Sequence, residues 1–102
     1  MKQDNVPIVE TTDFNNPSVS LPHPLGGTQK IWRFKNGYGA SVVRFPYSYG
    51  YEVGLWELGV LQFNDDETYG LTYETNVSND VIGHLSAADV EVFLKKIQEI
   101  QQ

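Results

Sequence analysis

Residues that could bind a metal or act as a catalytic base are few and lie far apart in this sequence. The only histidines are His23 and His84, 61 positions apart (84 − 23). No histidine and carboxylate share metal-ligand spacing on one expected element, so we predict no metal site. The chain has no cysteine, which excludes a disulfide, a thiolate metal site and a cysteine nucleophile. We interpret His84 as a structural residue, capped or half-buried ahead of a helix.

Catalytic constellations are equally weak. A Ser-His-Asp set can be assembled only from scattered residues, namely Ser41 or Ser48 with His84 and Asp80, and the sequence contains no nucleophile-elbow motif. Two carboxylate pairs are present, Glu52 with Glu57 and Asp65 with Asp66. The first pair straddles a loop and the second lies at an expected hairpin tip, which is typical of solvated charge rather than of acid–base catalysis. We therefore expect a protein that is not an enzyme and that uses no cofactor.

One stretch has the composition of a binding surface. Residues 46–54 contain a proline, two glycines and three tyrosines at alternate positions. Tyrosine offers a large contact area at low entropic cost, and arginine pairs with carboxylates or phosphates. The alternative, that the tyrosines fold back and cover the sheet, remains open. The predicted contact residues are Tyr47, Tyr49, Tyr51, Arg44 and Glu52.

Alternating and apolar runs predict the strands that would position this loop. The most apolar run, residues 55–63, is bounded by turn-forming residues and carries apolar side chains on both faces, which indicates a central strand covered on both sides. Further strands are predicted over residues 30–35, 38–45 and 68–74. Asn36-Gly37 predicts a hairpin with a type I′ turn, in which both central residues have positive φ.

The C-terminal segment has the signals of one amphipathic helix. Ser86 is a good N-cap, and Asp89 three residues later completes a capping-box pattern. The stripe that would cover one face of the sheet is formed by Val90, Phe93, Leu94, Ile97 and Ile100. The predicted fold is therefore α+β, an antiparallel meander of four or five strands with one C-terminal helix packed on one face.

The first 28 residues differ in composition from the remainder. They hold four of the five prolines, and proline disfavours a regular helix or a central strand. We expect residues 1–28 to form an extended or partly disordered arm, with a short edge strand around Val6, Ile8 and Val9 as an option. Phe14, Val19 and Leu21 would attach the arm to a single domain over residues 29–102.

Charge is unevenly distributed along the chain. The net charge is −6, although residues 30–45 contain four basic residues and no acidic residue. Net acidity disfavours direct sequence-specific nucleic-acid binding. It permits a partner with a basic surface, and the alternative is that the acidic residues simply keep a small protein soluble. No signal peptide or membrane-length apolar run is evident, so we expect no membrane association and a cytoplasmic location.

Several strings resemble a family of small, largely uncharacterised proteins of tailed bacteriophages. They are Asn36–Arg44 (NGYGASVVR), Gly54–Val60 (GLWELGV) and Asn79–Leu85 (NDVIGHL), and the resemblance covers about residues 30–97. It implies a phage accessory protein that inhibits or modulates a host protein in the bacterial cytoplasm, for example a defence system such as CRISPR. Two alternatives stay open: a sponge for a nucleotide signal at an oligomer interface, such as a homodimer, and a virion-associated structural protein.

Overall fold

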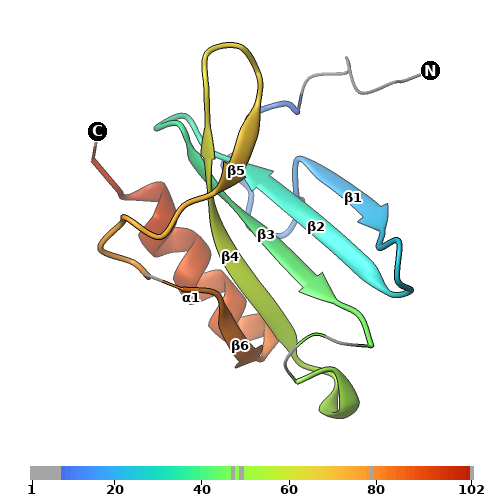
Figure 1. The fold of residues 1–102 in the computed structure, drawn as a ribbon. Coiled ribbons are helices and arrows are strands. Elements are labelled where there is room, and N and C mark those ends of the chain that lie inside the picture. Colours follow the sequence, from blue (N-terminus) through green and yellow to red (C-terminus); the bar gives the residue numbers. More distant parts are fainter. Residues whose placement is uncertain (1–7, 47, 49, 79, 102) are drawn as a thin grey trace, which may run out of the picture.

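The computed structural model describes residues 8–46, 48, 50–78 and 80–101. One antiparallel sheet carries a single long helix on one face (Figure 1). The elements are β1 (Val19–Pro22), β2 (Thr28–Arg33), β3 (Tyr38–Arg44), the short 3₁₀ turn η1 (Tyr51–Val53), β4 (Trp56–Phe63), β5 (Tyr69–Leu71), β6 (Ile82–Leu85) and α1 (Ala87–Gln98). The predicted α+β class, with a meander and a C-terminal helix, is confirmed.

The sheet has six strands, where four or five were expected. The order is β1-β2-β3-β4-β5, and β6 returns to pair with the start of β4. Trp56 faces Leu85 in this last pairing, while the other end of β4 pairs with β5. Consequently β5 and β6 share one edge of β4, and β1 forms the opposite edge of the sheet (Figure 1).

The central strand β4 is covered on both faces, as its sequence predicts. Leu58 and Val60 are buried on the helix side, in a cluster with Trp32 of β2 and with Phe34, which follows β2. On the opposite face Leu61, Phe63 and Ile31 form a second, smaller cluster. The alternation of side chains along a strand accounts for this division.

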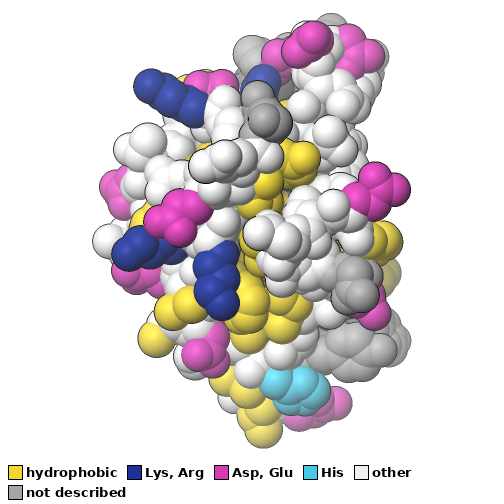
Figure 2. Space-filling view, turned by 90° about the vertical axis from the view of Figure 1, so that its left-hand side faces the viewer, with side chains coloured by type: hydrophobic (Ala, Val, Ile, Leu, Met, Phe, Trp, Pro, Cys, Tyr) yellow, Lys and Arg dark blue, Asp and Glu magenta, His cyan; other side chains and the backbone are white. Residues whose placement is uncertain are grey.

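Helix α1 begins with a well-defined N-terminal cap. The Ser86 Oγ accepts a hydrogen bond from the Asp89 backbone N–H, and the Asp89 carboxylate accepts one from the Ser86 N–H, which confirms the capping box. The predicted stripe packs on the sheet, mainly against β3, β4 and β6. Figure 2 shows the helix side of the molecule, where hydrophobic side chains lie between scattered charges of both signs.

The β2–β3 hairpin forms, but its turn differs from the predicted type I′ geometry. Gly37 has φ 87°, whereas Asn36 is not among the residues with positive φ. The loop thus closes with a single left-handed glycine, which is common in hairpins longer than two residues. With negative φ at Asn36, its side-chain amide reaches the end of α1, where Nδ2 donates to the carbonyls of Ile97, Gln98 and Ile100.

The N-terminal segment crosses the end of the sheet before forming its edge strand. Residues 8 and 9 form no strand, so the edge strand considered there is wrong for these positions, and Val6 lies outside the described residues. Ile8 and Val19 pack on the smaller cluster and Phe14 on the larger one, whereas Leu21 is 43% exposed. The segment thus contacts both faces of the sheet.

Candidate binding surface

The tyrosine loop, residues 45–54, joins β3 to β4 and is stabilised by hydrogen bonds between its own residues. Ser48 is buried, and its Oγ accepts from the Phe45 N–H (3.0 Å) and donates to the Phe45 carbonyl (2.8 Å). Gly50 and Gly54, with φ 89° and 75°, bracket η1 in conformations that favour glycine. The Leu55 N–H then closes the loop on the Gly50 carbonyl at 2.9 Å. The described part of the loop is therefore a series of defined turns.

This loop presents apolar side chains to solvent. Tyr51 is 38% exposed and Val53 is 69% exposed, with the exposed Glu52 between them. None of these three side chains belongs to either hydrophobic cluster. Tyr47 and Tyr49, the other two predicted contact tyrosines, lie outside the described residues.

Arg44 connects the loop to a cluster of aromatic and basic side chains. Its Nη1 donates to the Gly54 carbonyl at 3.2 Å, and its guanidinium carbon lies 4.4 Å from the centroid of the Trp56 ring. The Lys30 Nζ lies 4.8 Å from the same centroid. Two cations therefore share one indole, an attractive arrangement because the face of the ring is electron-rich.

The base of the loop is packed against the β1–β2 turn. The His23 and Phe45 rings stack with their centroids 3.9 Å apart and their planes 6° apart. The His23 Nδ1 accepts a hydrogen bond from the Leu25 N–H at 3.1 Å. His23 is thus a structural residue that ties two loops together at this end of the sheet. His84 lies within β6 with φ 58° and an exposed side chain, so of the two positions considered for it, capped or half-buried, the half-buried one is wrong.

The predicted site contained Arg44 but omitted Trp56 and Lys30. The alternation of side chains in the sequence tells only which face of its own strand each of these three residues occupies. The pairing of Lys30 with Val42, and of Val43 with Glu57, is required to bring the three together. Register was the missing information, because alternation within a strand does not say which residues are cross-strand neighbours.

Elsewhere, the clearest electrostatic feature is the pair between Arg33 and Glu67, with Nη1 2.6 Å from Oε1. This hydrogen bond lowers the pKa of the Glu67 carboxyl and raises the pKa of Arg33. Within the described residues, no three His, Asp or Glu side chains are grouped to hold a metal ion. No helix in the same part of the chain is long and apolar enough to cross a membrane.

Comparisons with known proteins give no match: none to a family model, none to a curated protein and none to a solved structure.

Proposed function

We propose that this chain is a non-enzymatic phage accessory protein that binds a host bacterial protein and modulates it. The tyrosine loop, with Arg44 beside it, is the contact surface. The observation that carries the proposal is the exposure of Tyr51 and Val53 on a turn with defined backbone hydrogen bonds. A fixed loop loses little entropy on binding, and Tyr, Trp and Arg dominate the energetics of interfaces.

The charge of the chain supports a partner with a basic surface. A net charge of −6 attracts such a partner at long range and raises the association rate. At short range Glu52 is available to a cation of the partner, and Arg44 to a carboxylate. We therefore expect capture of the partner to weaken as the salt concentration rises.

The test is affinity capture from a bacterial lysate with a matched pair of double variants. The loop variant is Tyr51→Ala with Val53→Ala. The control is Tyr73→Ala with Val92→Ala, which removes the same side-chain types from positions of 46% and 53% exposure outside the loop. We expect the control to capture the same protein as wild type and the loop variant to lose it, with both variants melting as cooperatively as wild type.

Equal capture by the two variants would show that the loop is not the contact surface. Loss of the cooperative melt in the loop variant would show instead that Tyr51 and Val53 serve the fold.

A further inference from the structure

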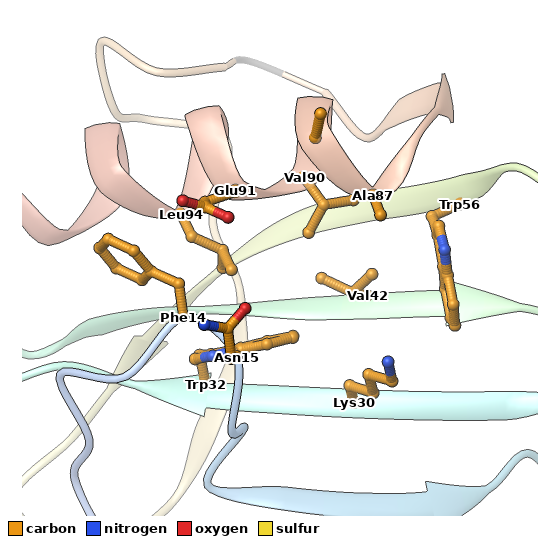
Figure 3. A pocket seen from close by; sticks show the side chains of 11 residues that line it. Phe14, Asn15, Lys30, Trp32, Val42, Trp56, Ala87, Val90, Glu91 and Leu94 are labelled. Atoms are coloured by element: carbon orange, nitrogen blue, oxygen red, sulfur yellow. The ribbon is translucent and has the colours of Figure 1, made fainter.

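A cavity of about 250 Å³ lies on the helix side of the sheet, at the edge of α1. The helix packs mainly on β3, β4 and β6, so the start of β2 is not covered by it. The turn containing Phe14 and Asn15 closes the cavity on the far side from Trp56 (Figure 3). None of the described residues of the tyrosine loop lines this α1 cavity.

Aromatic side chains form much of its wall, and two of them are held in place. The Trp32 Nε1–H donates to the Asp13 carbonyl at 3.1 Å, which fixes the indole. The Phe14 ring packs edge-on against Phe34, with centroids 6.1 Å apart. Trp56 stands at the other end of the cavity (Figure 3). The cavity is therefore preformed, with flat apolar surfaces around a small volume.

Polar groups of different kinds converge on this space. The Lys30 ammonium lies beside Trp56, with Arg44 over the same indole. Asn15 and Glu91 lie on the side away from Trp56 (Figure 3). Within the described part of the chain, Lys30 and Glu91 form no ion pair, and the Asn15 side-chain amide makes no hydrogen bond. These groups are available to a ligand.

We propose that the α1 cavity binds a small planar aromatic molecule carrying an anionic group, with nucleoside monophosphates as the leading class. The ring lies among Trp32, Trp56 and Phe14, and the anionic group lies at Lys30. Asn15 and Glu91 accept hydrogen bonds from N–H groups on the edge of a nucleobase.

Size and chemistry both select this class. The volume is slightly below the roughly 300–1,000 Å³ typical of small-molecule sites, so one or two fused rings fit. Stacking on aromatic side chains accepts any base, because every base has a π-face. The ammonium of Lys30 adds a charge-assisted bond that a neutral ring does not form.

The chain provides its own reporter for this binding. It has two tryptophans, and both line the cavity. Tryptophan emission, excited where nucleotides do not absorb, is followed during titration with AMP, GMP, CMP and UMP, with their uncharged nucleosides and with phenylacetate. Thermal melting with the same compounds gives an independent measure, since a ligand of the native state raises the melting temperature.

Three variants locate the site. Lys30→Gln is expected to weaken nucleotide binding about tenfold or more while leaving nucleoside binding unchanged. Lys95→Gln makes the same change of charge in the last turn of α1, outside the cavity, and is expected to bind as wild type does. Ala87→Phe places a ring in the cavity and is expected to abolish the emission change.

Saturable binding of a nucleotide that depends on Lys30 supports the proposal and identifies the source of the anion as phosphate. If only phenylacetate binds, and its binding depends on Lys30, the cavity takes an aromatic ring with an anionic group, and that group is a carboxylate. Absence of a saturable response to every compound up to about 10 mM overturns the proposal. Equal affinity for nucleotides and nucleosides also overturns it, because the cation would then have no role.

Discussion

Asn36 shows how one side chain can connect two elements that are distant in sequence. Its Oδ1 accepts from the Tyr38 N–H at 3.0 Å, which shapes the hairpin loop. Its Nδ2 donates to the carbonyls of Ile97 and Gln98 in the last turn of α1 and to the Ile100 carbonyl just beyond it. The last carbonyls of a helix have no partner within the helix. The Ile97 carbonyl also accepts from the Ile100 N–H at 3.1 Å, and the Asn36 amide adds a partner for the Gln98 carbonyl. A turn residue therefore also acts as the C-terminal cap of the helix.

Replacing Asn36 with Asp separates the acceptor role from the donor role. The acceptor for Tyr38 is kept, but the donors are lost and a negative charge is placed at the negative end of the helix dipole. We expect Asn36→Asp to lower the free energy of unfolding by about 1–3 kcal/mol, measured by urea denaturation. Asn76→Ala, at an exposed asparagine, is the control and is expected to stay within about 0.5 kcal/mol of wild type. Equal stability of Asn36→Asp and wild type would contradict the capping role.

The ion pair between Arg33 and Glu67 predicts a dependence of stability on pH. The hydrogen bond from Arg33 holds the pKa of the Glu67 carboxyl below its ordinary value of 4.5. A carboxyl with a lowered pKa in the folded state adds stability at higher pH, and this stability is lost as the pH falls through the folded-state pKa. Melting temperatures measured from neutral pH down to below pH 4.5 should therefore fall less steeply for Glu67→Gln than for wild type. The control is Glu74→Gln, at an exposed carboxylate after β5, which should follow the wild-type curve. A Glu67→Gln curve parallel to that of wild type would show that the ion pair with Arg33 does not contribute to the pH dependence of stability.

At the scale of elements, the contact between β2 and β3 depends on a position without a side chain. A Cβ added at Gly39 would lie 1.9 Å from the Trp32 carbonyl oxygen and 2.8 Å from the Phe63 ring. We expect Gly39→Ala to lower the free energy of unfolding by about 2 kcal/mol or more, because backbone and a buried ring must move. Gly70→Ala is the matched control: a Cβ there meets nothing within 4 Å. Similar denaturation midpoints for the two variants would refute this account.

Helices and strands with a strong periodic pattern were predictable from the sequence. Strands that form only because a neighbouring strand offers an unpaired edge were not. Helix α1 and strand β4 have long patterns, so their type and buried face were predictable. The predicted helical stripe continues to Ile100, whereas α1 ends at Gln98. Strands β1 and β6 have four residues each, and β1 ends in a proline. They exist because β2 and β4 offer unpaired edges, a fact that local sequence does not contain. The same reasoning explains why the tyrosine loop was identified from composition, whereas the cluster around Trp56 required the register.

At the scale of the whole molecule, the sheet has two apolar faces, and among the described residues one α-helix covers one of them. On the face opposite α1, Ile8 and Val19 of the N-terminal segment pack on the cluster of Ile31, Leu61 and Phe63. The Arg33 Nη1 anchors this segment by donating to the Ile8 carbonyl at 3.0 Å. The N-terminal segment is thus the cover on the second face, which the two apolar faces of β4 require. The same segment carries Phe14 to the helix side, where it closes the α1 cavity.

Substitution of Phe14 tests whether the N-terminal segment is an integral part of the core. Its ring joins the larger cluster edge-on to Phe34. We expect Phe14→Ala to lower the free energy of unfolding by about 1–2 kcal/mol, because the lost ring is half-buried and packs against another aromatic ring. Because the ring also lines the cavity containing Trp32, the native tryptophan emission should shift to longer wavelength. Val9→Ala removes an apolar side chain that is 70% exposed in the same segment, and both stability and emission should remain those of wild type. If Phe14→Ala behaves like Val9→Ala in both measurements, the N-terminal segment does not contribute to the stability of the core. The wall that Phe14 gives to the α1 cavity is then not preformed.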